Sequence, residues 1–354
     1  MDILGILQDA AEKKASDIFI VAGIPVSYKI NGNIVRTDGE KLMPDDTKEL
    51  IEQMYHMSNE RSMESFEKTG DDDFSFSVNN LSRFRINAYR QRGSMAAVIR
   101  VISFTLPNYK ELGIPDNVMR LSELNSGFVL VTGPAASGKS TTLACIVNAI
   151  NENRNAHIIT LEDPIEYLHR HKKSVVSQRE VPLDTQSYVT ALVAALRQSP
   201  DVIQLGEIRD SETIRTAVTA AETGHFLLST LHTIGAANTI DRIVDAFPEH
   251  QQQQIRVQLS MVLRAVVSQQ LIPSADGGVV PAFEVMYVNS AIKTMIRDNK
   301  IHQIDSAIFS SGDENMISMD NSLFNLYKHG IITEETALIY SINKALMQKK
   351  IEKI

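Results

Sequence analysis

The chain has 354 residues, of which 43% are apolar and 22% charged, and its net charge is −8. This composition excludes a disordered chain, and 354 residues are enough for two or three domains with hydrophobic cores. No apolar run approaches the ~18 residues of a membrane span, and the first residues lack the early positive charge of a secretory signal, so we expect a cytoplasmic protein. The acidic balance argues against nucleic acid as a partner, because phosphate binding depends on a basic surface.

Residues 1–103 predict a small α+β domain. Helices are expected over 2–14 and 45–56, and strands over 18–21, 26–36, 73–78, 83–90 and 95–102. Asn31-Gly32 divides the 26–36 segment into two alternating runs, which is a strong hairpin signal. We interpret residues 104–115, with Pro107 and little periodicity, as a linker.

Residues 116–354 predict an α/β domain. Apolar strands are expected over 127–132, 157–161, 201–205 and 225–231, with Gln204 interrupting the third. Helices are expected between them over 139–151, 185–198 and 211–223, an order typical of an open, mainly parallel sheet. Beyond residue 233 we expect mainly helices, over 235–246, 249–271 and 289–299, with one hairpin at Gly277-Gly278.

A phosphate loop follows the first of these strands. Residues 133–142 read GPAASGKSTT and fit the pattern G-x-x-x-x-G-K-S/T between a strand and a helix. Backbone N–H groups of such a loop cradle phosphates, while Lys139 would reach the β- and γ-phosphates and Ser140 would ligate Mg²⁺. The residues expected to bind ATP are Gly133, Pro134, Ala135, Ala136, Ser137, Gly138, Lys139, Ser140 and Thr141.

Three further segments place polar groups where strands end, which is the edge at which open α/β sheets bind ligands. Glu162 in LEDPIEY could orient or deprotonate a water, although a solvated acidic loop is the alternative. Glu207 after DVIQL could hold Mg²⁺ through water. His232 after HFLLSTL could sense phosphate or water, whereas Asp210 is explained by helix capping.

Five arginines lie close together at the end of the first domain, and they are Arg83, Arg85, Arg90, Arg92 and Arg100. They could form a face for nucleic acid, supply positive charge to a transferred phosphoryl group, or lie on a solvated strand, which we prefer for Arg83 and Arg90. Cys145 is the single cysteine, so we expect a buried thiol and neither an internal disulfide nor a multi-cysteine zinc site.

These motifs together resemble the type II and type IV secretion ATPases, and within them the PilT-like ATPases of type IV pilus retraction (twitching motility). The stretches GPAASGKSTT, LEDPIEYLH, GEIRDSETI and AAETGHFLLSTLHT look like that family's Walker A, Asp box, Walker B and His box, and IDRIVDAFP like its continuation. The resemblance implies a hexameric ring with a PAS-like N-terminal domain and a RecA-like ATPase domain in each subunit. It also implies a location at the inner face of the cytoplasmic membrane, against an inner-membrane pilus platform protein.

The resemblance also implies roles for individual residues. Glu162 would be the general base, Lys139, Ser140 and Glu207 would serve phosphate and Mg²⁺, and His232 would be the His-box residue. Arg85 and Arg100 match N-domain arginines that approach the phosphates.

Two features favour retraction over pilus extension. Extension and secretion members usually carry a tetracysteine zinc subdomain, which one cysteine excludes, and AIKTMIRD at 291–298 resembles the AIRNLIRE motif of retraction members. In that segment Ile292, Met295 and Ile296 share a helical face, and Lys293 and Arg297 form a basic stripe on another.

Departures from the family pattern are Ala136, at a position where glycine is common, and Val193, where many members have arginine. The alternatives to a retraction motor are an accessory retraction or pseudopilus/secretion ATPase, a RecA-like nucleic-acid motor, and a non-hydrolysing ATP-dependent scaffold.

Overall fold

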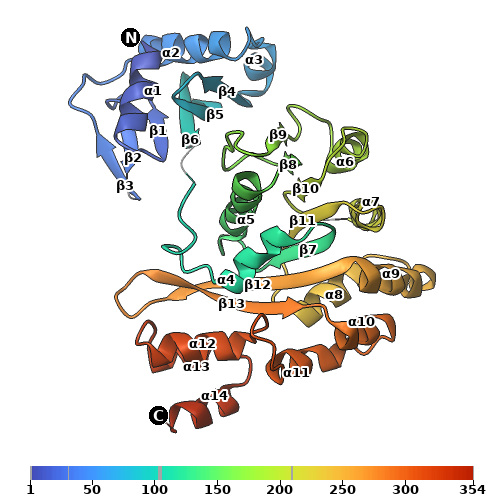
Figure 1. Cartoon of the computed structure of the whole chain (residues 1–354). Coiled ribbons are helices and arrows are strands. Elements are labelled where there is room, and N and C mark those ends of the chain that lie inside the picture. The colour runs from blue at the N-terminus through green and yellow to red at the C-terminus, as the bar shows by residue number, and fades with distance from the viewer. Residues whose placement is uncertain (1, 31, 103–105, 209, 354) are drawn as a thin grey trace. The chain divides into compact units, whose positions relative to one another are not determined.

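The structure, a computed structural model, describes residues 2–30, 32–102, 106–208 and 210–353. The chain divides into two compact units, Met1–Thr105 and Leu106–Ile354, which are coloured blue to cyan and cyan to red in Figure 1. The predicted linker 104–115 therefore contributes most of its residues to the second unit, and Thr105 lies outside the described residues.

The first unit is an α+β domain with one antiparallel sheet. Its strands are β1 (Asp17–Ile20), β2 (Ser27–Ile30), β3 (Asn33–Arg36), β4 (Asp71–Val78), β5 (Ser82–Gln91) and β6 (Ser94–Ile102). Their order across the sheet is β3-β2-β1-β6-β5-β4. Its helices are α1 (Ile3–Glu12), α2 (Pro44–Met57) and α3 (Glu64–Thr69). Alternating strand residues such as Phe84 and Ile86 are fully buried and pack with Leu7 and Leu50 from the helices, which fixes the face of the sheet that the helices cover.

The hairpin predicted in this unit is confirmed by the register of β2 and β3. Ile30 pairs directly with Asn33 in antiparallel orientation, so the chain reverses between them. Asn31 itself lies outside the described residues.

The second unit is built on a seven-stranded sheet. Its strands are β7 (Gly127–Thr132), β8 (His157–Glu162), β9 (Val175–Glu180), β10 (Val202–Leu205), β11 (Phe226–Leu231), β12 (Leu263–Pro273) and β13 (Val279–Tyr287). Their order is β13-β12-β7-β11-β10-β8-β9, and every neighbouring pair is parallel except β12 with β13.

Helices connect these strands and follow them. They are α4 (Asp116–Met119), α5 (Lys139–Asn153), α6 (Tyr188–Ala195), α7 (Ser211–Glu222), α8 (Ala236–Asp245), α9 (Glu249–Val262), α10 (Ser290–Arg297), α11 (Ile304–Phe309), α12 (Met319–Lys328), α13 (Glu334–Tyr340) and α14 (Lys344–Ile351), with 3₁₀ turns η1 (Arg120–Glu123) and η2 (Ile301–Gln303).

Both faces of this sheet are covered, which explains its near-continuous apolar strands. Val129 and Val131 of β7 pack on one face with residues of α4 and α5. Phe128 and Leu130 point to the other face and pack with α6, α7 and α8. The C-terminal helices α12, α13 and α14 pack at the far end of the β12–β13 ribbon, as Figure 1 shows.

One sequence prediction in this unit is wrong, and one strand has no counterpart among the predicted elements. The helix predicted over 249–271 ends at Val262, and Leu263–Pro273 forms β12 instead. The strand β9 was not predicted, because its sequence VVSQRE is mostly polar. The α/β class predicted for this unit is confirmed, as is the hairpin at Gly277-Gly278, which joins β12 to β13.

Within the described residues, every helix is too short or too polar to cross a lipid bilayer.

Candidate active site

The phosphate loop runs from the end of β7 at Thr132 to the start of α5 at Lys139, as its sequence predicts. Gly133 adopts a φ of 144°, and a Cβ there would lie 2.1 Å from the carbonyl oxygen of Gln269 on β12. Only glycine fits so close to a neighbouring backbone. Gln269 also accepts a hydrogen bond from Thr142 Oγ1 at 2.7 Å. The strand β12 therefore contacts both the loop and the first turn of α5.

The side chain of Lys139 folds back onto this loop. Its side chain is largely buried, and Nζ donates to the carbonyl oxygens of Gly133 at 3.0 Å and Pro134 at 2.8 Å. Burial lowers the pKa of Lys139, while the carboxylates of Glu207 and Glu166 act in the opposite direction. The ammonium group is thus held beside the loop, where a phosphate oxygen could replace the backbone acceptors.

A cavity of about 220 Å³ opens beside this loop. It lies at the carboxyl ends of β8, β10 and β11, the edge at which parallel sheets bind ligands. The predicted site residues that line it are Ala135, Ala136, Lys139, Ser140, Glu162, Glu207 and His232. The structure therefore brings the four predicted segments together.

Glu162 is the most unusual group in the cavity. Its side chain is only 8% exposed, and its Oε1 accepts from Thr160 Oγ1 at 2.6 Å and from Gln178 Nε2 at 3.1 Å. Burial raises the pKa of Glu162 to about 7, although both hydrogen bonds act in the opposite direction. A carboxyl group with a pKa near neutrality is suited to take up and release a proton.

Four other polar side chains of the cavity form two pairs. His232 Nε2 lies 3.3 Å from Glu207 Oε2, and Ser140 Oγ donates to Glu166 Oε1 at 3.3 Å. The described residues contain no cluster of three or more acidic, histidine or cysteine side chains that could enclose a metal ion. A hydroxyl and one carboxylate beside a phosphate loop nevertheless fit Mg²⁺, which binds with substrate phosphates and waters and few protein ligands.

Some neighbours of Glu162 were not predicted as site residues. Gln178 lies on the unpredicted strand β9 and also donates to the carbonyl of Tyr167 at 2.9 Å, so it ties the LEDPIEY segment to Glu162. Glu166 belongs to that same segment and could have been found from it. Thr160 is one of two polar residues in the strand before Glu162, which is a signal that the sequence offered.

Two acidic residues have other roles or positions. Asp210 caps α7 by accepting from the Thr213 backbone N–H at 2.8 Å, as predicted. Asp163 is exposed at the rim of the cavity. Arg209, in the Walker B-like stretch, lies outside the described residues.

Arg85 and Arg100 lie in the first unit, opposite each other on β5 and β6. Arg100 Nε donates to Asp17 Oδ1 at 3.2 Å, and its side chain is 69% exposed. Arg85 Nη2 lies 3.9 Å from Asp73 Oδ2. The two guanidinium groups line a hollow of about 260 Å³ on this unit. Arg100 is exposed while its partner Asp17 is buried, and both members of the Arg85–Asp73 pair are at least partly exposed.

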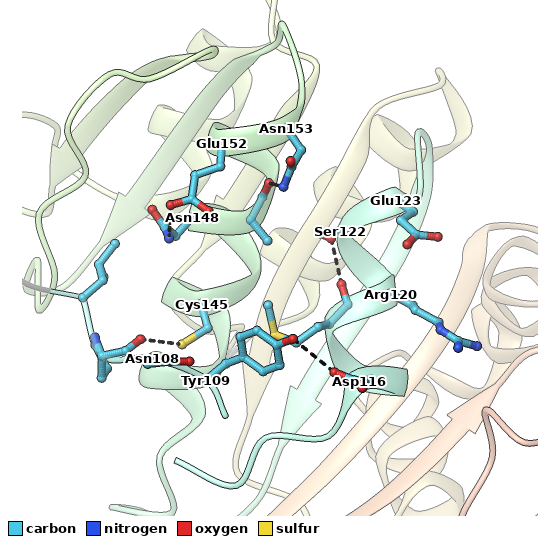
Figure 2. A pocket seen from close by; sticks show the side chains of 14 residues that line it. Asn108, Tyr109, Asp116, Arg120, Ser122, Glu123, Cys145, Asn148, Glu152 and Asn153 are labelled. Atoms are coloured by element: carbon cyan, nitrogen blue, oxygen red, sulfur yellow. Dashed lines mark hydrogen bonds between the residues drawn. The ribbon is translucent and has the colours of Figure 1, made fainter. Parts of the chain in front are cut away.

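A larger cavity, of about 690 Å³, lies along another part of α5 and shares no lining residue with the first. Figure 2 shows Tyr109, Asp116 and Arg120 on one side and Cys145, Asn148 and Glu152 of α5 on the other. Cys145 Sγ contacts the Pro107 carbonyl at 3.7 Å, and burial raises the pKa of the thiol to about 11. This confirms the prediction of a buried structural thiol.

The sequence of the chain matches the family model of the type II/IV secretion system protein over residues 2–312. It is 43% identical over 337 residues to the type IV pilus retraction ATPase PilT of Pseudomonas aeruginosa, covering 95% of this chain and 97% of that protein. It is 41% identical over 336 residues to a twitching motility protein of Neisseria gonorrhoeae, covering 95% and 89%.

A solved structure shows the same similarity. The structure of the pilus retraction motor PilT with bound ADP matches with a TM-score of 0.88 and 45% identity, covering all of both chains. The RecA-like ATPase fold expected from the sequence is confirmed by this match.

Proposed function

Because the chain belongs to the type II/IV secretion system protein family, we propose that it is the ATP-hydrolysing motor of type IV pilus retraction. Its similarity over 95% of its length to a type IV pilus retraction ATPase and to a twitching motility protein supports this function. The observation that carries the chemistry is Glu162, a buried carboxylate with a raised pKa in the same cavity as the phosphate loop.

In the proposed reaction, Glu162 removes a proton from a water that attacks the γ-phosphorus of ATP. The backbone N–H groups of residues 133–141 and the Lys139 ammonium hold the β- and γ-phosphates, since a helix start and a cation both favour negative charge. Thr160 and Gln178 fix the carboxylate of Glu162, so that it is oriented before substrate binds.

Ser140 and Glu207 are the groups that would hold Mg²⁺, Ser140 directly and Glu207 through water. Bound Mg²⁺ supplies positive charge to the phosphate oxygens as negative charge shifts toward the leaving group. His232 lies beside Glu207, and in this proposal it reports through that contact whether the γ-phosphate is present.

The wider assembly is part of the same proposal. The chain forms a homohexamer, lies at the inner face of the cytoplasmic membrane, and acts on an inner-membrane pilus platform protein. Arg85 and Arg100 supply additional positive charge to the phosphates. Nucleic acid is not a partner, in keeping with the net charge of −8.

The chemistry is tested by Glu162→Gln, which keeps the volume of the side chain and its hydrogen bonds but removes the base. ATP should still bind, while turnover falls at least ~10²-fold, the usual contribution of general-base catalysis. The control is Glu212→Gln, which neutralises an exposed glutamate of α7 and should leave turnover unchanged. Near-normal turnover of the Glu162 variant would remove Glu162 from the mechanism.

The biological role is tested by counting pili and measuring twitching in a deletion strain. A retraction motor predicts excess pili and no movement. Loss of pili would instead indicate an assembly or secretion ATPase, and ATPase activity stimulated by DNA would indicate a nucleic-acid motor.

A further inference from the structure

Gln204 is a polar residue in the interior of an apolar strand. It lies on β10 between Ile203 and Leu205, which are both fully buried. Its own side chain is 94% buried, since only 6% of it is exposed, and its Oε1 has no hydrogen-bond partner among the described residues. A buried amide oxygen without a donor costs stability, so a reason for its presence is needed.

The position of Gln204 places it next to Glu162. Gln204 pairs with Thr160 on the neighbouring strand β8, and Glu162 follows Thr160 by two residues, so all three side chains leave the sheet on one face. Gln204 and Glu162 both line the 220 Å³ cavity beside the phosphate loop. The residue that carries the unpartnered oxygen therefore lines the cavity where hydrolysis is proposed.

A water attacking phosphorus has two O–H groups, and a general base accepts only one of them. The second O–H needs an acceptor that holds the water with its lone pair toward phosphorus. Glu162 Oε1 is already occupied by Thr160 and Gln178. Gln204 lines the same cavity, and its amide oxygen, an acceptor left free by the described residues, cannot compete for the proton, because an amide is not a base at neutral pH.

We propose that Gln204 is a further catalytic residue, whose Oε1 accepts the second hydrogen of the attacking water. This inference rests on the proposed role of Glu162. In the step, the water oxygen forms a bond to the γ-phosphorus, and its proton moves to the Glu162 carboxylate. The bond from the γ-phosphorus to ADP breaks, its electron pair stays on the ADP oxygen, and Gln204 remains neutral throughout.

The direct test is Gln204→Leu, with Gln204→Met as a second variant that keeps the length of the side chain. The expected result is a fall in kcat of about 10-fold or more, the loss of roughly one hydrogen bond to the water. The affinity for a non-hydrolysable ATP analogue should change less than about 2-fold, because the amide does not hold the nucleotide. Unchanged kcat in both folded variants would overturn the proposal, and so would weaker analogue binding with unchanged kcat.

The matched control is Ser229→Ala. Ser229 lies on the neighbouring strand β11, is fully buried, and has a hydroxyl without a partner among the described residues, but it does not line the cavity. Removing it should leave kcat unchanged. A similar fall in both variants would mean that any change to a buried polar group of the sheet impairs turnover.

A double-mutant cycle separates this inference from the proposed function. If both residues act on one water, adding Gln204→Leu to Glu162→Gln should lower single-turnover hydrolysis little further. Two independent, multiplying effects would overturn a shared water. If Glu162→Gln alone keeps its turnover, the proposed base fails; if it loses turnover and Gln204→Leu does not, only the present inference fails.

Discussion

Glu162 carries a carboxyl group into an interior where its charged form is disfavoured, so the site should cost the protein stability. Burial raises its folded-state pKa from an ordinary value of 4.5 to about 7. Between pH 4.5 and about pH 7 the folded state keeps a proton that the unfolded state has lost. The free energy of unfolding therefore falls as pH rises through this range. The destabilisation by the Glu162 carboxylate is complete above about pH 7 and absent below pH 4.5.

Glu162→Gln should therefore be more stable than the wild type at pH 8, by up to ~3 kcal/mol for a shift of this size. The difference should shrink toward pH 4.5, where the wild-type carboxyl is protonated in both states. Urea unfolding of the two proteins at pH 8 and pH 5 measures it. A variant that is less stable than the wild type at pH 8 would show that the carboxylate is stabilised in the fold.

Ala136 shows what a residue-level resemblance can and cannot predict. The sequence identifies it as a departure from a common glycine, and the structure gives the physical reason for that preference. Ala136 has a φ of 59°, in the left-handed region, which costs a residue with a Cβ roughly 1–2 kcal/mol. A small residue is accepted there, whereas the backbone angle could not be read from the sequence.

Elements that were predicted correctly carry their signal locally. The helix α10 has Ile292 and Ile296 buried and Met295 packed against the core, as the spacing predicts. The strand β12 was mistaken for helix because its residues continue the pattern of α9. What makes Leu263–Pro273 a strand is its pairing with β7 and β13, which are far away in sequence.

The stripe of Lys293 and Arg297 on α10 gives a prediction about coupling to the membrane partner. The variant Lys293→Glu with Arg297→Glu should fold, because the Arg297 side chain pairs with its neighbour Asp298 at 3.0 Å in an exposed position and surface changes usually cost within about 0.5 kcal/mol. We expect a hexamer that hydrolyses ATP at the wild-type rate, in cells that do not retract pili. Light scattering, phosphate release and a twitching assay measure the three properties.

The control for this variant applies the same charge change to another helix. Lys344→Glu with Lys349→Glu reverses two exposed lysines of α14 and should leave twitching intact. Normal twitching of the α10 variant would show that Lys293 and Arg297 belong to an ordinary solvent-exposed face of the helix. Loss of the hexamer would show that the stripe is structural.

At the scale of the whole molecule, the sequence predicted the α/β class and the convergence of four segments on one cavity. That success has a simple cause, since each segment follows a parallel strand and such strands end at one edge. The buried neighbours of Glu162 were harder to predict. Gln178 reaches it from β9, a mostly polar strand, and Gln204 read as an interruption of β10. Their meaning depends on which strands are adjacent, which the order β11-β10-β8-β9 supplies.

The last prediction concerns the arginines of the first unit and the reaction of the second. If Arg100 supplies charge to the departing phosphoryl group, Arg100→Ala should lower kcat more than it lowers nucleotide affinity, because that charge matters most in the transition state. The fold should be little affected, since Asp17, the buried partner of Arg100, keeps its hydrogen bond from Ser16 Oγ at 2.8 Å. The comparison is Arg92→Ala, which removes the same charge from an exposed position between β5 and β6. The prediction is tested by measuring steady-state ATP hydrolysis and the binding of a non-hydrolysable ATP analogue for both variants. Equal turnover in the two would leave Arg100 as a solvated strand residue, whereas a loss confined to Arg100→Ala would make the first unit a participant in hydrolysis.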